Sequence, residues 1–239
     1  MTTMYSLTVG DWLTQGWESY KRNAKLLIAA SGIYALYDLL LICATYAPYG
    51  TLFYLLAFFL ISPPLVVGWY YLIVKIVRNE PASFSDLFAG FSQFGAAWST
   101  YILTGLIVLG GIILLIVPGI IFILKYGLSC YAVLDRRLSA IESISLSNRI
   151  TKGYKGKLFF LVMCIYPLIS IVYLPCAFVA HQFLQGLGST TMLLFGIIPF
   201  LANILIILPW TTASCACAYH NLVLRYDMSE KENIAPAIQ

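Results

Sequence analysis

Long apolar stretches separated by short polar segments dominate the chain. They run over about 26–46, 52–74, 98–134, 158–179 and 192–224. A helix needs about 20 apolar residues to cross a hydrocarbon core about 30 Å thick, so each stretch is long enough to span a membrane. The third stretch would reach about 55 Å as one straight helix, which predicts two spans within it. The pattern therefore predicts six membrane-spanning helices.

The break in the third stretch is expected at Val117, Pro118 and Gly119. Proline lacks the N–H that continues a helix, and glycine permits a tight reversal. This predicts a helical hairpin with its tip at Pro118, between spans 98–116 and 119–134.

Prolines also lie inside other predicted spans, among them Pro63 and Pro64 in 52–74 and Pro199 and Pro209 in 192–224. The last span is long and is expected to be bent or tilted. Proline inside lipid is tolerated where neighbouring helices supply donors to the freed carbonyls.

The composition agrees with a lipid environment. Of the 239 residues, 61% are hydrophobic and only 10% are charged, and the mean hydropathy is +0.87. A water-soluble fold of this size could not cover itself with so little polar surface. The predicted class is an all-α polytopic membrane helical bundle, with six transmembrane helices arranged as three hairpins. It forms a single integral membrane domain over 1–239, with short interfacial amphipathic helices and a cytoplasmic tail over 227–239.

The positions of the cations predict an orientation. Of the 14 Lys and Arg residues, 13 fall in segments that can all lie on one side of a membrane. The connections on the other side, 47–50, the Pro118 tip and 180–190, contain none. Because cations are in excess in cytoplasmic loops, both termini are predicted to be cytoplasmic. The expected location is the bacterial inner (cytoplasmic) membrane.

Three segments on the cation-rich side have an amphipathic pattern. The segment 8–21 places apolar side chains at helical spacing and is expected to lie in the membrane interface. A second begins at Ser83 with Asp86 three residues on, and a third at Ser139 with Glu142 three residues on, both typical of a capped helix start. The apolar residues of the first two segments are Val9, Trp12, Leu13, Trp17 and Tyr20, then Phe84, Leu87, Phe88, Phe91 and Phe94.

A basic run follows the third segment and consists of Arg149, Lys152, Lys155 and Lys157. Each cation near an anionic surface contributes about 1 kcal/mol, so these residues are candidate contacts for anionic lipid headgroups or a regulatory contact. The alternative is that they only set the orientation of the neighbouring spans.

Asp38 and Lys125 are the two ionisable side chains placed deep within predicted spans. Asp38 lies 13 residues beyond Lys25, and Lys125 lies 10 residues before Asp135, which puts both about 15–20 Å from the inner boundary. A charge there costs about 2.5–3.5 kcal/mol unless it is paired or hydrated. They are a candidate intramembrane polar pair, which would close one span onto another or line a polar path. Alternatively, Lys125 snorkels and Asp38 meets water.

Six cysteines all lie inside predicted spans, without the spacing of a zinc site or a redox motif, so no metal and no cofactor are expected. A weak repeat is also present, because the second, fourth and sixth spans each combine a proline with a later tyrosine. The pairs are Pro64 and Tyr71, Pro118 and Tyr131, and Pro209 and Tyr219. Three similar hairpins would explain this repeat.

A group of residues between 112 and 160, and another between 81 and 90, give the chain a family resemblance. They are Pro118, Gly119, Ile120, Tyr126, Tyr131, Leu134, Asp135, Ala140, Glu142, Ser147, Lys152, Gly153, Lys155, Lys157 and Phe159, then Phe84, Asp86, Leu87 and Phe88. The chain resembles an uncharacterised bacterial six-span membrane family, which includes the membrane domain fused to some glycerophosphodiester phosphodiesterases. The resemblance implies the fold and no chemistry, because the hydrolase activity of the fused members belongs to a separate soluble barrel that this chain lacks.

Two functions of different class follow. One is a non-catalytic membrane protein in membrane assembly, envelope maintenance or regulation, and the other is a small transporter or lipid-handling protein with a polar intramembrane site. No enzyme activity is expected, because the sequence contains no nucleophile beside a base, no phosphate-binding loop and no paired carboxylates. The expected partner is the lipid bilayer with its anionic headgroups. No nucleic acid is expected, and a homo-oligomer or a protein partner stays open.

Overall fold

The computed structural model describes residues 8–165, 167, 170 and 198–234, and over these residues the fold is all-α without a strand. Five helical segments are long and apolar enough to cross a membrane: Ala24–Leu41, Gly50–Val77, Phe94–Leu114, Ile116–Asp135 and Phe200–Glu232. The helices in chain order are α1 (Val9–Arg22), α2 (Ala24–Ala44), α3 (Gly50–Val77), η1 (Phe84–Phe88), α4 (Ala89–Ser92), α5 (Phe94–Leu114), α6 (Ile116–Tyr126), α7 (Ser129–Asp135), α8 (Ala140–Ile150), a helix over 155–165, α11 (Ile198–Ala202), η3 (Asn203–Ile207) and α12 (Leu208–Ile234).

Part of the prediction falls outside the described residues. The predicted span 158–179 is described as helical over 158–165, and most of its remainder lies outside them, as do the loop 180–190 and the start of span 192–224. The first two hairpins of the prediction are described, and of the spans of the third only residues 158–165, 167, 170 and 198–224 lie in this part of the chain.

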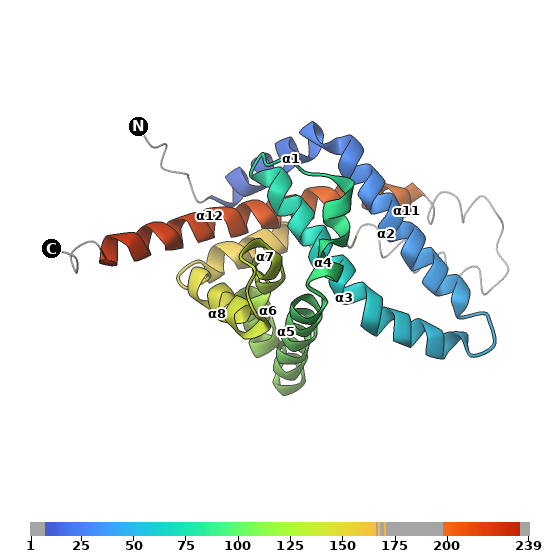
Figure 1. Cartoon of the computed structure of the whole chain (residues 1–239). Helices are drawn as coiled ribbons and strands as arrows, with labels where there is room; N and C mark the ends of the chain where they lie inside the picture. The colour runs from blue at the N-terminus through green and yellow to red at the C-terminus, as the bar shows by residue number, and fades with distance from the viewer. Residues whose placement is uncertain (1–7, 166, 168–169, 171–197, 235–239) are drawn as a thin grey trace.

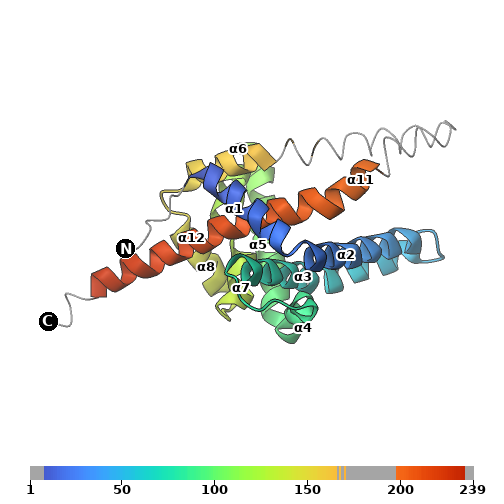
Figure 2. The ribbon, with the colours of Figure 1, turned by 90° about the horizontal axis from the view of Figure 1, so that it is seen from above.

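Two helical hairpins diverge from a common base (Figures 1 and 2). The helices α2 and α3 form one hairpin, and α5 and α6 form the other, while α7 and α12 both pack against α3 at the base. The inner part of α3 is buried, but the outer halves of both hairpins expose large apolar side chains. Lipid is the solvent that favours such a surface. These side chains include Leu39, Leu40, Leu52, Phe53, Leu106, Leu109, Ile113 and Leu114.

The predicted break between α5 and α6 is confirmed, but its predicted place is wrong. The chain turns at Leu115, which is extended, and Pro118 lies within the first turn of α6. The first turn is the part of a helix that tolerates proline, since its N–H groups have no intrahelical acceptor. Gly111 and Gly119 face each other across the hairpin, and a Cβ on Gly111 would lie 3.0 Å from the Gly119 Cα. These glycines let the two helices approach closely.

The predicted span 119–134 is two helices, α6 and α7, joined at Gly127 and Leu128. The break frees the carbonyl of Lys125, and α8 with its following turn replaces the missing donor. The Ser147 hydroxyl donates to that carbonyl at 2.7 Å, and the Thr151 hydroxyl, which donates to the Ser147 carbonyl at 2.8 Å, lies 3.4 Å from it. The helix break is thus stabilised by a hydroxyl from the adjacent element.

The first amphipathic helix, α1, packs along α12, and its place in the membrane interface stays a prediction. Trp12 is 0% exposed and Tyr20 is buried, whereas Trp17 remains partly exposed. Gly16 permits this packing, because a Cβ there would lie 2.7 Å from the Ser214 backbone nitrogen. The apolar stripe of α1 is therefore covered by protein.

The last predicted span is irregular, as expected from its prolines. It consists of α11, a π-helical stretch over η3, and α12. The helix α12 continues to Ile234, so the predicted cytoplasmic tail from residue 227 is helical over its first part. A π-helical segment is a frequent place for a bend or for altered packing.

Both predicted capping boxes are confirmed, at Ser83 with Asp86 and at Ser139 with Glu142. In the first of these segments Leu87 is fully buried against the core, while the phenyl rings around it stay about 40% exposed. Lys75 on α3 also donates to Asp86 at 2.8 and 2.9 Å. This ion pair holds the start of η1 against the end of α3.

Two aromatic side chains serve backbone carbonyls that prolines leave free. Pro63 cannot donate to the carbonyl of Phe59 four residues earlier, and the Trp98 indole donates to that oxygen at 2.7 Å. In the same way Pro209 frees the carbonyl of Leu205, and the Tyr20 hydroxyl donates to it at 2.8 Å. The expectation that neighbouring helices serve the freed carbonyls is confirmed at both sites.

Replacing Trp98 by Phe should lower the free energy of unfolding in detergent by about 1 kcal/mol, because the Phe59 carbonyl loses its donor. In a Pro63→Ala background the helix supplies its own N–H, so the same Trp98→Phe change should cost much less. A denaturant titration of the four proteins measures the difference. Equal losses in both backgrounds would show that the indole acts through packing alone.

The pair of Lys75 and Asp86 predicts a pH dependence. Burial raises the pKa of Asp86, but hydrogen bonds from Lys75 and Ser83 outweigh it and lower the pKa below its ordinary value of 3.8. The carboxylate therefore stabilises the fold above pH 3.8, and this stability is lost as the pH falls through the lowered pKa. Asp86→Asn should reduce the melting temperature at pH 7 and have little effect near pH 2. A deficit that stays constant with pH would contradict this assignment.

Candidate functional site

Three tyrosines stack at the base of the molecule, where α3, α7 and α12 meet. The ring of Tyr131 lies 4.3 Å from that of Tyr70 and 5.8 Å from that of Tyr219, measured between centroids, and both pairs are stacked. The sequence repeat had singled out Tyr131 and Tyr219, which the structure brings together. Its third member, Tyr71, instead packs near Lys75, and the neighbouring Tyr70 completes the stack.

A buried ion pair lies next to this stack. The Asp135 side chain is 3% exposed and accepts from both terminal guanidinium nitrogens of Arg78, from Nη2 at 2.8 Å. The Tyr219 hydroxyl donates to the same carboxylate at 2.6 Å, and the Arg78 Nε donates to His220 at 3.2 Å. A two-point contact between Arg and a carboxylate is among the stronger charge-assisted arrangements.

Local helix geometry explains why these groups meet. Tyr131 and Asp135 are four residues apart, so they lie on one face of α7. One residue of α12, Tyr219, can then stack on the first and donate to the second. We call Arg78, Asp135, Tyr219 and His220 the base cluster, and it ties α3, α7 and α12 together.

Two further contacts attach the C-terminal half of α12 to the region around α8. Arg136 forms an ion pair with Asp227, and the Arg149 guanidinium donates to the Tyr226 hydroxyl at 3.4 Å. These contacts are more exposed than the base cluster, so they contribute less to stability.

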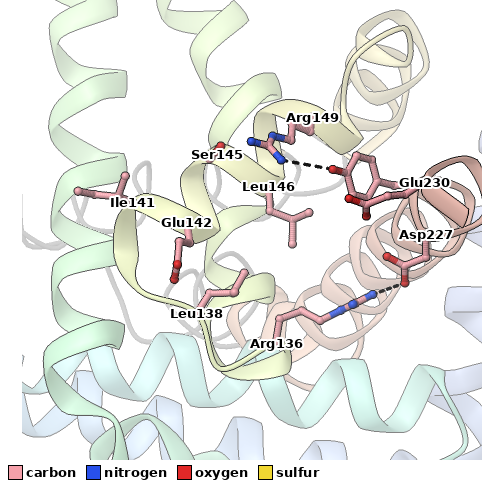
Figure 3. A pocket seen from close by; sticks show the side chains of 10 residues that line it. Arg136, Leu138, Ile141, Glu142, Ser145, Leu146, Arg149, Asp227 and Glu230 are labelled. Atoms are coloured by element: carbon pink, nitrogen blue, oxygen red, sulfur yellow. Dashed lines mark hydrogen bonds and ion pairs between the residues drawn. The ribbon is translucent and has the colours of Figure 1, made fainter. Parts of the chain in front are cut away.

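A cleft of about 530 Å³ lies between α8 and this half of α12 (Figure 3). Its lining includes two cations, Arg136 and Arg149, and the carboxylates of Glu142, Asp227 and Glu230, with apolar side chains between them. The whole set of lining residues is Arg136, Leu138, Ile141, Glu142, Ser145, Leu146, Arg149, Tyr226, Asp227 and Glu230. The cleft therefore offers both signs of charge beside an apolar surface.

Local contacts shift the pKa values of Glu142, Arg149 and Arg136 in the direction that favours their charged forms. Hydrogen bonds from the Ser139 backbone and hydroxyl lower the pKa of Glu142. The contact with Tyr226 raises the pKa of Arg149. Burial lowers the pKa of Arg136, but the bond to Asp227 outweighs it and raises the pKa above its ordinary value.

The structure does not bring the predicted pair of Asp38 and Lys125 together. Asp38 is exposed on α2, which packs against α3, while Lys125 ends α6, which packs against α5 and α8. The Lys125 ammonium lies 5.0 Å from the Tyr126 ring centroid, and no ion pair joins it to Asp38. Similar depth in a membrane was insufficient to predict contact, because the two helices belong to different hairpins.

The four residues of the basic run lie in different surroundings. Arg149 belongs to the cleft, and Lys157 lies 5.7 Å from the Tyr154 ring centroid, which Arg225 also approaches. Lys152 is exposed and Lys155 is half-buried at the start of the helix over 155–165. Their role as headgroup contacts stays a prediction.

Five of the six cysteines lie within the described residues, where each has a free thiol, and Cys176 lies outside them. In this part of the chain no group of three or more His, Cys, Asp or Glu side chains has the arrangement of a metal site.

The base cluster is the feature that sequence reasoning missed. Arg78 and His220 were assigned no role from the sequence, and Asp135 served only to estimate the depth of Lys125 and as part of the family resemblance. The available indication was the spacing of Tyr131 and Asp135 on one helix face, next to a helix with the adjacent pair Tyr219 and His220.

Comparisons with known proteins give no relative for this chain. No family model matches it, and neither does any curated protein or solved structure.

Replacing Asp135 by Asn should lower the free energy of unfolding by about 3 kcal/mol, because it leaves the largely buried Arg78 with only the exposed Glu80 carboxylate, 3.8 Å away, as a counter-charge. The double variant Arg78→Met with Asp135→Leu should recover most of this loss. The matched control is Asp227→Asn, which breaks a more exposed pair and should cost less than about 1 kcal/mol. Thermal unfolding in mild detergent compares the variants. Additive losses in the double variant would show that the two residues act independently.

Proposed function

We propose that this chain is a non-catalytic integral protein of the bacterial inner membrane, acting in membrane assembly, envelope maintenance or regulation. Its task is to hold a fixed cytoplasmic surface, built around α8 and α12, at the membrane. In this proposal the protein crosses the membrane six times as three hairpins, with both termini in the cytoplasm. The resemblance to the six-span family that accompanies some phosphodiesterases is part of the same proposal.

The main observation in support of this proposal is that the charges at the base form ion pairs with one another and so fix the helices that carry them. The buried charges of Arg78 and Asp135 bond to each other, and Arg136 with Asp227 fixes the adjacent helices. A cleft of about 530 Å³ with both signs of charge lies beside these contacts. A charged cleft of fixed geometry next to apolar hairpins supports the proposal that this surface binds a polar partner.

The distribution of apolar and basic residues supports the orientation. The outer halves of the hairpins carry exposed leucine, isoleucine and phenylalanine side chains, and the cations gather at the opposite ends of the helices. Cations at that end favour contact with anionic headgroups of the cytoplasmic leaflet. Arg149, Lys152, Lys155 and Lys157 are the proposed contacts.

The second candidate is a small transporter or lipid-handling protein. A polar path would need Lys125 in a water-accessible cavity, and Lys125 instead lies against Tyr126. An apolar cavity of about 190 Å³ elsewhere in the molecule favours the lipid-handling form of this candidate. We therefore retain it only in that form.

Site-specific photo-crosslinking in cells tests whether the surface around α8 and α12, here called the platform, contacts a protein partner. A benzoylphenylalanine at Ser145, inside the cleft, should give one discrete protein adduct, because the cleft faces a cytoplasmic partner in this proposal. The same residue at Ile113, which is 75% exposed near the tip of the second hairpin, should give only lipid adducts.

A charge variant tests whether the adduct at Ser145 depends on the charges of the cleft. Glu230→Lys changes the cleft without touching the base cluster, and it should remove the adduct at Ser145 while leaving the amount of protein in the membrane unchanged. Only lipid adducts at both positions would contradict the platform. Solute movement into vesicles that contain the purified protein alone would support a transporter instead.

A further inference from the structure

A cavity of about 190 Å³ lies between α6, α7, α12 and the helix over 155–165. Its lining is apolar except for the tyrosine hydroxyls and one thiol. A water molecule needs two to four polar partners, so a cavity of this kind favours an apolar occupant. The lining residues are Tyr70, Ile123, Leu124, Gly127, Leu128, Tyr131, Leu158, Leu161, Val162, Cys215 and Ala218.

The cavity has an apolar opening at the surface. Ile123 and Gly127 line it and are exposed, whereas Leu158 and Leu161 on the facing helix are buried. The opening therefore lies beside the predicted span 119–134, where the surrounding solvent is lipid in the proposed orientation.

A cation lies on the same helix face as residues that line the cavity. Leu158, Leu161 and Val162 share one face of the helix over 155–165, and Lys155 lies on that same face, three residues before Leu158. Lys155 is half-buried, whereas Lys157 is exposed and packs near the Tyr154 ring. One helix face thus presents a positive charge at its cytoplasmic start and an apolar cavity about one turn further on.

We infer that this cavity binds one acyl chain of an anionic phospholipid, whose headgroup meets Lys155. The occupant is amphipathic and negatively charged because the site is apolar inside and cationic at its edge. This inference rests on the proposed orientation but is separate from the platform role, so its failure leaves the result of the crosslinking experiment unchanged.

Native mass spectrometry of the full chain in mild detergent, titrated with phosphatidylglycerol, tests the site. The wild-type protein should hold one phosphatidylglycerol tightly and bind phosphatidylcholine about fivefold more weakly, as expected for the loss of one cation contact. Lys155→Gln should weaken phosphatidylglycerol binding by the same factor. The matched control Lys231→Gln, at the far end of α12, should leave it unchanged.

Two variants fill the cavity itself. Ala218→Leu and Cys215→Leu each add side-chain volume to its wall and should remove the one-lipid complex, with Lys155 intact. If Ala218→Leu fails to fold, Cys215→Leu decides, because Cys215 is only partly buried. A complex that persists in the folded variant, or equal binding of the two lipids, overturns the inference.

Discussion

The buried carboxylate of Asp135 holds the base of the molecule together. It accepts from Arg78 on α3 and from Tyr219 on α12, so one residue of α7 fixes the mutual positions of three helices. A charge removed from water at this depth is tolerated only with a partner and further hydrogen bonds. The tyrosine stack next to it excludes water, which strengthens these bonds. Because these charges are paired at the base, the hairpins that extend from it can have mostly apolar surfaces.

The same requirement, that polar groups in lipid find a partner within the protein, explains the interrupted helices. Prolines at 63 and 209 each free one carbonyl, and an aromatic donor from another helix replaces the missing N–H. The break after α6 frees the carbonyl of Lys125, which then accepts from the Ser147 hydroxyl of α8. Each interruption therefore fixes a neighbouring element in place. Irregular helices and specific packing are two results of one constraint.

The sequence predicted what depends on local pattern. Apolar length gave the spans near α2, α3 and α5, and the two capping boxes gave the starts of η1 and α8. It did not predict which helices pack together, since that depends on contacts far apart in the chain. The stripe of α1 fits lipid or protein equally well, and only its contact with α12 decides between them. For the same reason Asp38 and Lys125 looked like partners, whereas Arg78 and Asp135, 57 residues apart, were not recognised as a pair.

The two ends of the molecule differ in the kind of partner they suit. Apart from Asp38, the outer hairpin surfaces are apolar, so lipid acyl chains satisfy them without specificity. The base has fixed charges, a cleft and a small cavity, and fixed polar groups discriminate between partners because a mismatched one leaves them unpaired. Specific recognition, whether of a protein or of a lipid, is therefore expected at the base and not along the hairpins. The ties made by Asp135 matter for function as much as for stability, since they keep the walls of both sites in place.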